Sequence, residues 1–330
     1  MRKSITVAIS DYEFFLNALL VQSINAEHFA LLYSHPTIFK NHDQRYHQYD
    51  LLVAIGALET MSQDIPNALS TMKRHLQNHQ DWHFGYIGYD VKNEIEELAS
   101  GNYDGPEFPD VFFFIPRFVV EANNEKATIH FHVDVDSPAT VHQWLQSFKK
   151  TSIPCGQIHR IKVRPRISRD AYLLKVDELK QHLYRGDIYE VNFCQEFFND
   201  DIEIVPENLF YHLLKQHPAP FSAFLKTGDK YILSTSPERY LKKEGGKVVS
   251  QPIKGTAKRK KEYAADQHER NYLQNNPKER AENTMIVDLV RNDLSRICQK
   301  GSVCVEELCS VYPFPTVHQM ISTITGMVQK

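Results

Sequence analysis

The sequence predicts a mixed α/β protein of the α+β type, and three segments carry this prediction. Thr128–Val135 alternates apolar and polar residues, as expected of an antiparallel strand with one buried face. Arg169–Arg185 repeats apolar residues at helical spacing and ends at Gly186, a frequent helix terminator. Gly245 and Gly246 form a two-residue hairpin signal between two strand-like segments.

Further strands and helices are predicted in the first half of the chain. Aromatic segments bounded by proline or glycine indicate strands, and apolar residues at helical spacing indicate helices. In chain order these are a helix at Tyr49–Glu59, strands at Phe84–Tyr89 and Phe108–Pro116, and a helix at Ala139–Lys150. A polar linker follows. We therefore expect a boundary near residue 160, between an N-terminal α/β subdomain (1–160) and a second subdomain (161–330).

The second half is predicted to contain four strands and then a helix. The strands are Ile188–Phe197, Lys230–Ser234, Tyr240–Lys243 and Lys247–Ile253. The helix begins at Asn276, a good N-cap, with Pro277 at its first position and Glu279 completing a capping-box pattern.

Composition excludes several classes of protein. The 330-residue chain has 38 Lys and Arg against 41 Asp and Glu, a formal charge of −3, which argues against nucleic acid as a partner. No run approaches the ~18 apolar residues that a membrane helix requires, so we expect no membrane partner. The five cysteines are odd in number and follow no metal-ligand spacing, as expected of a reduced, cytoplasmic protein.

An acid and a lysine are predicted to meet at the open end of the hairpin. A two-residue turn places Glu238 opposite Ile253, one step from Lys254. A bulge would place the acid and the lysine directly opposite each other. Gly255 follows, so backbone N–H groups can approach an anionic ligand there. The alternative interpretation of this spacing is a surface salt bridge.

Two carboxylates share one face near the start of the last predicted helix. Glu279 and Glu282 are three residues apart, and apolar residues expected to face the core follow Glu282 at Met285, Ile286 and Leu289. A carboxylate over a buried stripe needs a cation, and oxygen ligands alone favour Mg²⁺ over Zn²⁺. The alternative is stabilisation by the helix macrodipole, which explains Glu279 better than Glu282.

The remaining polar clusters are interpreted as structural. His130, His132 and Asp134 alternate with apolar residues, so they are expected on the wet side of an edge strand. The basic run Lys258–Lys261 is expected to be a solvated loop. No cysteine lies in a Gly-Cys-Gly elbow, so no glutaminase nucleophile is evident.

Five motifs occur in a fixed order over residues 170–326. They are Gly186–Asn192, Ser234–Tyr240, Pro252–Thr256, Ala281–Leu294 and Pro315–Gln319. Together they resemble the chorismate-utilising enzymes, which include the anthranilate, aminodeoxychorismate, isochorismate and salicylate synthases. The resemblance implies stacked antiparallel β-sheets flanked by helices. The first half matches more loosely, through Tyr49–Ala54 and Phe84–Asp90.

Within this family the lysine at position 254 discriminates between activities. Anthranilate synthases usually have alanine there, whereas component I of aminodeoxychorismate synthase has lysine. The sequence also has no Leu-Leu-Glu-Ser element near its N-terminus, which is the tryptophan-feedback signature of anthranilate synthases. The resemblance therefore implies conversion of chorismate and ammonia to 4-amino-4-deoxychorismate, the precursor of p-aminobenzoate and folate. Anthranilate synthase component I is the alternative enzyme.

The resemblance also implies roles for the residues singled out above. Lys254 would attack the chorismate ring at C2 while Glu238, as general acid, protonates the departing C4 hydroxyl. Glu282, with Glu279 behind it, would bind Mg²⁺ and so hold the ring carboxylate.

Three further residues are implied to bind the substrate. Gly255 and Thr256 would contact a carboxylate, and His318 would contact the ring substituents. Ammonia would come from a separate glutamine amidotransferase subunit, in keeping with the missing cysteine elbow.

Two departures from the family pattern stand out. Glu190 occupies a position where synthases of the family often have Gln. The family also normally continues past Gly326 with a Gly-Ser-x-Thr-Gly-Ala-Pro-Lys motif and a second pair of metal-binding glutamates, which the sequence does not contain. We therefore expect it to be part of a longer enzyme. A non-catalytic remnant that binds an amidotransferase is the alternative.

Overall fold

The computed structural model describes residues 1–35, 44–148 and 161–329, in two compact units. The main unit comprises Met1–Ile153 and Phe210–Lys330, and the smaller unit comprises Pro154–Leu209. The domain boundary expected near residue 160 lies outside the described residues and stays a prediction.

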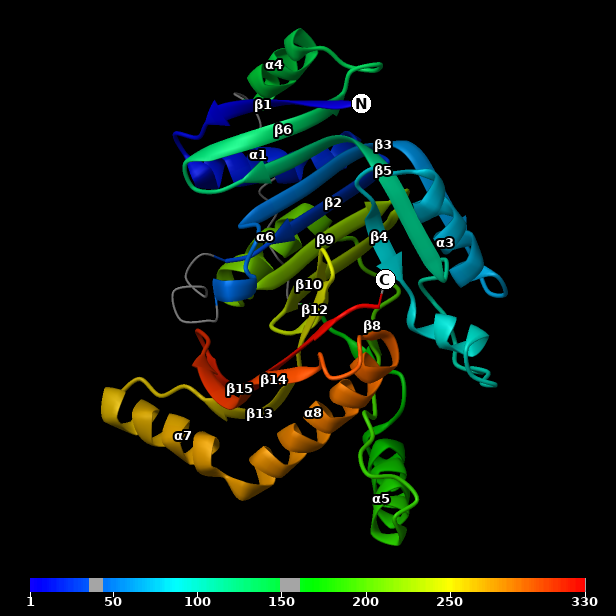
Figure 1. Cartoon of the computed structure of the whole chain (residues 1–330), viewed down its shortest axis with the longest axis vertical. Coiled ribbons are helices and arrows are strands. Elements are labelled where there is room, and N and C mark those ends of the chain that lie inside the picture. The colour runs from blue at the N-terminus through cyan, green and yellow to red at the C-terminus, as the bar shows by residue number, and fades with distance from the viewer. Residues whose placement is uncertain (36–43, 149–160, 330) are drawn as a thin grey trace. The chain divides into compact units, whose positions relative to one another are not determined.

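A large antiparallel sheet of eight strands dominates the main unit (Figure 1). Its order is β1-β6-β5-β3-β2-β9-β10, and β4 pairs with β5. The strands are β1 (Arg2–Ala8), β2 (His28–Tyr33), β3 (Leu51–Gln63), β4 (Phe84–Ile87), β5 (Val111–Ala122), β6 (Lys126–His132), β9 (Phe221–Thr227) and β10 (Lys230–Ser236). The last two strands bring the second half of the chain into a sheet built mostly from the first half.

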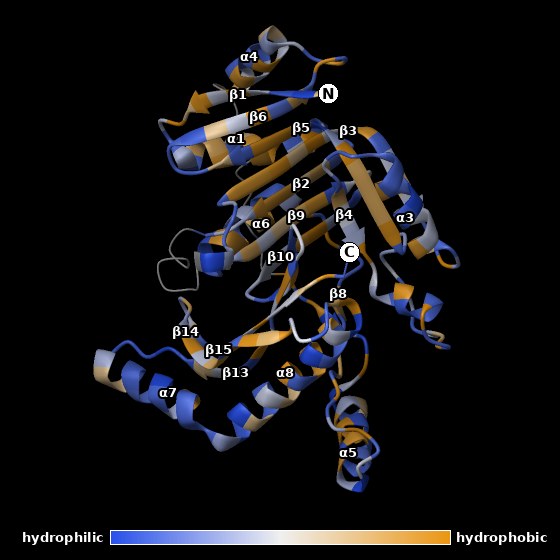
Figure 2. Ribbon diagram, in the orientation of Figure 1, coloured by the Kyte–Doolittle hydropathy of each residue, from blue (hydrophilic) through white to orange (hydrophobic). Residues whose placement is uncertain are grey.

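Alternate residues of the large sheet enter apolar cores on its two faces. Phe29 and Leu31 of β2 pack into one core, whereas Ala30 between them packs into the other. Helices α1 (Tyr12–Asn25), α4 (Pro138–Ser147) and α6 (Pro206–Gln216) contribute to the first core. The second core is rich in phenylalanines from β4 and β5. The hydrophobic colouring of these strands in Figure 2 reflects this burial.

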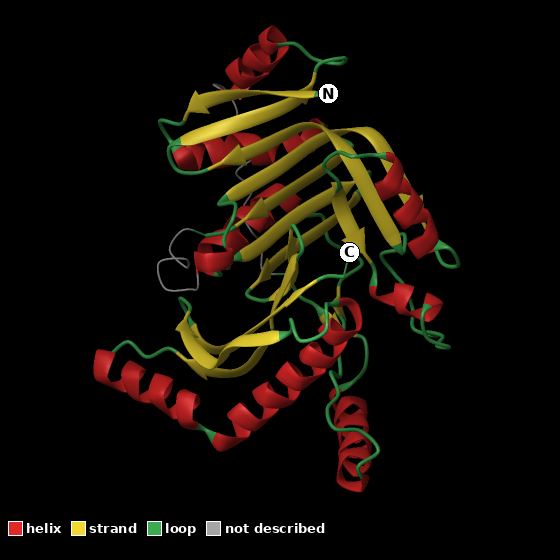
Figure 3. Cartoon of the chain, in the orientation of Figure 1, coloured by secondary structure: helices red, strands yellow, loops and turns green. Residues whose placement is uncertain are grey.

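A smaller antiparallel sheet of five strands forms the rest of the main unit. Its order is β11-β12-β15-β13, and β14 pairs with β15. The strands are β11 (Arg239–Glu244), β12 (Lys247–Gln251), β13 (Ile253–Lys258), β14 (Cys304–Pro313) and β15 (Val317–Met327). Helices α7 (Tyr263–Asn275) and α8 (Pro277–Ile297) lie together beside this sheet (Figure 3). Val287 and Leu294 of α8 pack on Val248 and Ile324 of the sheet.

Short elements complete the chain. In the main unit these are η1 (Gln44–Tyr46), α3 (Ala68–Asn78) and η2 (Tyr89–Glu94). The smaller unit contains α5 (Arg169–Arg185) and the paired two-residue strands β7 (Arg164–Pro165) and β8 (Phe197–Phe198). As the sequence predicts, α5 ends at Gly186, whose φ of 79° is left-handed.

The α+β prediction, with antiparallel sheets flanked by helices, is confirmed, and two predicted elements are wrong. Tyr49–Glu59 is not a helix, because Leu51–Gln63 forms the central strand β3. Its first five residues are buried, and a strand buried on both faces has no alternation to separate it from a helix. Ile188–Phe197 is mostly loop, with only Phe197 entering a strand. Among the described residues, no helix is both long and apolar enough to cross a membrane.

Candidate active site

The hairpin of β11 and β12 holds Glu238 near Lys254, but in a different register from the one predicted, because Glu238 follows on opposite Pro252 rather than Ile253 or Lys254. Glu244 pairs with Lys247 across the two-residue glycine turn. A register shift between Arg239 and Lys242 then adds one residue on the β11 side. The carboxylate of Glu238 accepts a hydrogen bond from the backbone N–H of Ile253, at 3.0 Å. The acid is therefore held beside the residue that precedes Lys254, and its side chain is exposed.

Gly255 brings strand β13 close to helix α8. Its φ of 97° is a conformation that side chains disfavour. A Cβ at this position would lie 3.1 Å from Oε2 of Glu279 and 3.3 Å from Cβ of Met320. Glycine is therefore required both for the backbone conformation and for the close approach of the Glu279 carboxylate. The structure thus brings together two of the predicted site residues from different elements.

Asn283 fastens α8 to the strand that carries Lys254. Its side-chain amide donates to the carbonyl oxygens of Lys254 and Met320, both at 3.2 Å, and it is 1% exposed. Its amide oxygen accepts from the hydroxyl of Ser322. Sequence reasoning gave Asn283 no role. The available signal was its spacing of four residues from Val287, which places both on the buried stripe of α8.

The buried face of α8 differs from the one that the sequence predicts. Asn283, Val287 and Leu294 are buried on α8, whereas Leu289 is 55% exposed. The expectation that Leu289 faces the core is therefore wrong, because α8 turns a different face to the small sheet. Glu282 is correspondingly a half-exposed side chain rather than a carboxylate over the core.

Glu279 and Glu282 nevertheless share a cation in the structure. The ammonium of Lys278 lies 3.2 Å from Oε1 of Glu282 and 3.9 Å from Oε1 of Glu279. This contact with Glu282 raises the pKa of Lys278. Asn276 caps the helix by accepting from the N–H groups of Lys278 and Glu279. Two adjacent carboxylates are hard oxygen donors of the kind that Mg²⁺ takes from proteins, and the exposed lysine can be displaced, so these residues fit that ion.

Thr256 and His318 lie on opposite faces of the small sheet. Thr256 pairs with Gln319, and its hydroxyl donates to the Gln319 side chain at 2.7 Å. His318, one residue along β15, pairs with Ala257 and is 1% exposed. The structure therefore does not bring the two predicted substrate contacts to one face. A substrate-binding role for either residue stays a prediction.

His318 belongs instead to a buried polar cluster with α7. Its Nε2 lies 3.1 Å from Oδ1 of Asp266, a residue that is 4% exposed. Arg259 donates to both oxygens of Asp266 at 2.9 Å, and the N–H of Lys260 donates at 2.8 Å. The Arg259 hydrogen bonds, followed by those of Lys260 and His318, hold the pKa of Asp266 well below its usual range. Sequence analysis missed Asp266 because nothing local marks it as buried.

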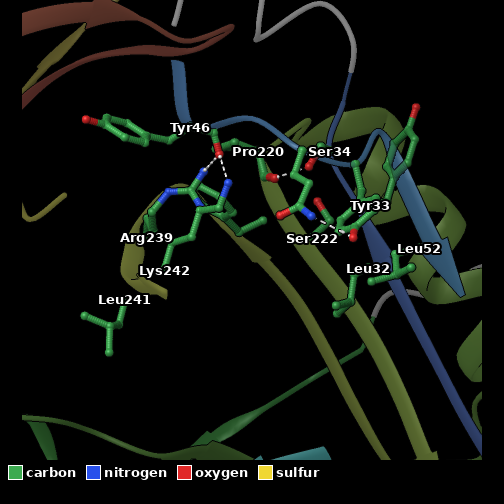
Figure 4. Close-up of a pocket in the computed structure, with 13 residues that line it drawn as sticks. Leu32, Tyr33, Ser34, Tyr46, Leu52, Pro220, Ser222, Arg239, Leu241 and Lys242 are labelled. Carbon is green, nitrogen blue, oxygen red and sulfur yellow. Dashed lines mark hydrogen bonds between the residues drawn. The ribbon is translucent and has the colours of Figure 1, made fainter. Parts of the chain in front are cut away.

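A separate pocket lies where residues of the two sheets meet (Figure 4). It has a volume of about 250 Å³. The large sheet contributes Leu32 and Ser222, and β11 contributes Arg239 and Lys242, which both donate to the carbonyl oxygen of Tyr46 at 3.2 Å. None of the predicted catalytic or metal-binding residues lines this pocket.

The model of the chorismate binding enzyme family matches residues 29–330. The chain belongs to this family. Aminodeoxychorismate synthase component 1 of Klebsiella aerogenes is 34% identical over 247 residues, which cover 73% of this chain and 53% of that protein. The protein of the same name from Salmonella typhimurium is 32% identical over 309 residues, covering 85% and 67%. The chain thus spans between half and two thirds of the length of these curated relatives.

The fold agrees with that assignment. Anthranilate synthase component I from Streptococcus pneumoniae superposes with a TM-score of 0.73 at 20% identity, covering 92% of this chain and 69% of the other. The resemblance found in the five sequence motifs is therefore confirmed at the level of the family and of the fold.

Proposed function

We propose that the protein carries out the chorismate step of aminodeoxychorismate synthase, which combines chorismate and ammonia into 4-amino-4-deoxychorismate. The observation that carries the proposal is Lys254 on β13, with the Glu238 carboxylate held at the neighbouring residue and the Glu279 carboxylate held against Gly255. Two relatives that are 34% and 32% identical bear the name of this enzyme. A nucleophile, an acid and a pair of metal-binding groups are the parts that the reaction needs.

Each residue has a stated task in the proposed reaction. The neutral amine of Lys254 forms a bond to C2 of the ring, both conjugated ring double bonds shift by one position, and the C4 hydroxyl leaves as water with a proton from Glu238. The proton released from the lysine nitrogen then returns to Glu238. Ammonia then bonds to C4, both double bonds shift back, and the Lys254–C2 bond breaks as a proton from the added ammonia passes to the lysine nitrogen. The lysine is regenerated, and the net change is replacement of hydroxyl by amine.

Glu279 and Glu282 would hold Mg²⁺, which when bound offsets the charge of the substrate carboxylate. Glu282→Gln should raise the Mg²⁺ concentration required for half-maximal activity by about tenfold, since one of two charged ligands is lost. Glu244→Gln, in the exposed hairpin, is the matched control. Activity that is unaffected by chelation would contradict the metal assignment while leaving the role of Lys254 open to its own test.

Ammonia would be supplied by a glutamine amidotransferase subunit. The proposal for this partner rests on the relatives being named as a component 1. A cytoplasmic location is proposed with it, because free cysteines suit a reducing compartment. Activity with glutamine alone, without any second protein, would contradict the need for such a partner.

The test of the proposed function is product analysis after incubation with chorismate, Mg²⁺ and an ammonium salt. We expect 4-amino-4-deoxychorismate. Formation of anthranilate and pyruvate would instead identify the activity of anthranilate synthase component I. Recovery of unchanged chorismate would contradict the proposal that this chain is catalytically active without a partner.

A further inference from the structure

Three side chains with metal-binding chemistry meet between β3 and α3, apart from the residues discussed above. Nε2 of His79 lies 3.0 Å from Oε1 of Glu59, and Nδ1 of His75 lies 3.6 Å from the same oxygen. One ligand atom from each of the three residues lies within 4.8 Å of the others. The two imidazole rings are 4.8 Å apart between centroids.

Local structure explains why these residues converge. His75 lies in the last turn of α3 and His79, four residues on, is the C-cap of the helix, so both lie on the same side of the helix end. Glu59 follows a register shift in β3 that lies just after Gly56, whose φ is +65°. Met61 of β3 and Ala68 of α3 are buried together and fix the helix against the strand. The strand and the helix that carry the cluster are therefore fixed against each other by packing.

His83 lies beside the cluster in a form suited to coordination. Its ring is edge-on to that of His75, at 5.2 Å between centroids. Its Nδ1 lies 2.9 Å from the carbonyl oxygen of Asp81, so this nitrogen carries the proton. Nε2 of His83 is then an acceptor, and it is buried without a hydrogen-bond partner among the described residues. A metal-ligating histidine is commonly oriented in this way, through a carbonyl on its other nitrogen.

His75 is buried, and the ring nitrogen that faces Glu59 is its Nδ1. His75 is 8% exposed at its side chain, and its Nε2 also has no hydrogen-bond partner in the described part of the chain. An ion bound at Nδ1 would leave Nε2 as the protonated nitrogen of a neutral ring, which is the form in which imidazole ligates metals.

The donor set and its spacing select the class of ligand. In a tetrahedral site with metal–ligand distances of ~2.0–2.2 Å, ligand atoms lie about 3.4 Å apart. The 3.0 Å and 3.6 Å separations from Glu59 bracket that value. Imidazole nitrogens favour Zn²⁺ and similar transition metals over Mg²⁺ and Ca²⁺. We propose that Glu59, His75 and His79 form a binding site for a divalent transition-metal ion such as Zn²⁺, with water as the fourth ligand and His83 beside the site.

The test is titration of the full chain, free of metal and of any histidine tag, with Zn²⁺ in a calorimeter. The wild-type protein should bind one Zn²⁺ ion saturably, and excess Mg²⁺ should not compete. His79→Gln should weaken this binding at least tenfold, since the 32% exposed side chain can be exchanged without opening the core. His142→Gln, at an exposed position of α4, is the matched control and should bind as the wild type does.

A second variant, Glu59→Gln, and the visible spectrum of bound Co²⁺ test the same site independently of His79→Gln. Glu59→Gln should also weaken Zn²⁺ binding at least tenfold, and Co²⁺ added to the wild type should give the strong visible absorption of a tetrahedral site. Circular dichroism checks that each variant is folded. Zn²⁺ binding that is absent, or that is equally strong in folded His79→Gln and Glu59→Gln, would overturn the proposal and leave the cluster as an ion pair between histidine and glutamate.

Discussion

The two sheets of the main unit differ in what their strands enclose. The large sheet is closed by aromatic and aliphatic side chains on both faces, with Phe29, Phe114 and Phe224 fully buried. The small sheet buries polar side chains against its helices, among them Asn283 and His318. Apolar burial contributes stability in proportion to area, whereas buried polar groups fix one geometry at the risk of unsatisfied atoms. The comparison indicates that the large sheet mainly supports the fold, whereas the small sheet carries the residues proposed to do the chemistry.

The largest expected effect is on catalysis, from the small sheet. Lys254→Ala should lower the rate of product formation by at least about a thousandfold, because the proposed covalent step loses its nucleophile. Lys258→Ala, at an exposed position at the end of the same strand, is the control. The rates are compared by product analysis with chorismate and an ammonium salt. Full activity in Lys254→Ala would remove the covalent role and favour direct attack by ammonia.

The next effect is on stability, from the large sheet. Phe224→Ala should lower the free energy of unfolding by at least about 3 kcal/mol, because it leaves a cavity among Phe29, Phe210 and Tyr231. Urea denaturation measures the loss. Below the unfolding transition, the KM for chorismate should stay near the wild-type value. If Phe224→Ala keeps its stability but loses substrate binding, then stability and substrate binding are not divided between the two sheets as stated above.

Asn283→Ala tests whether one residue serves both roles. The loss of its amide leaves the carbonyl oxygens of Lys254 and Met320 without this donor, so stability should fall by about 1–3 kcal/mol. As a positioning residue it should also lower kcat more than it raises KM, since its amide bonds to the strand that carries the proposed nucleophile. Asn292→Ala, exposed on the same helix, is the control. A purely structural role would leave kcat of the folded protein unchanged.

The smallest effect concerns pH and the Asp266 cluster. The pKa of Asp266 is lowered by Arg259, so its contribution to stability is full above the unfolded value of about 3.9 and is lost as pH falls toward the lower folded value. Asp266→Asn should therefore melt below the wild type at pH 7, and the difference should shrink below about pH 4. Asp293→Asn, on the exposed face of α8, is the control. A difference in melting temperature that is constant across pH 3–7 would contradict this assignment.

The sequence predicts an element correctly where a local pattern of residues is specific to one type of secondary structure. Alternation predicts β6, the glycine pair predicts the β11–β12 turn, and Asn276 with Pro277 predicts the start of α8. The strand β3 is mistaken for a helix because a run buried on both faces has no period of two. Its neighbours in the sheet come from distant parts of the chain, and the sequence of a single strand does not show which other strands it pairs with.

The candidate site is predicted in part for the same reason. Turn geometry predicts that Glu238 lies near Lys254, but a register shift in β11 places it opposite Pro252, where it accepts a hydrogen bond from Ile253. The positive φ of Gly255 agrees with the close backbone approach that the sequence predicts there. The approach of Glu279 to Gly255 depends on how α8 docks on β13, which no spacing reveals. The convergence of Glu59 with His75 and His79 likewise depends on a bulge in β3 and on packing of α3.

The most direct test of the account is the intact mass of the protein after mixing with chorismate and Mg²⁺ in the absence of ammonia. The proposed reaction then stops after the first displacement. We predict a species heavier by chorismate minus one water, with the added mass on the peptide that contains Lys254 and absent from Lys254→Ala. Turnover of chorismate with ammonia but no such adduct, or the same adduct in Lys254→Ala, would contradict the central claim.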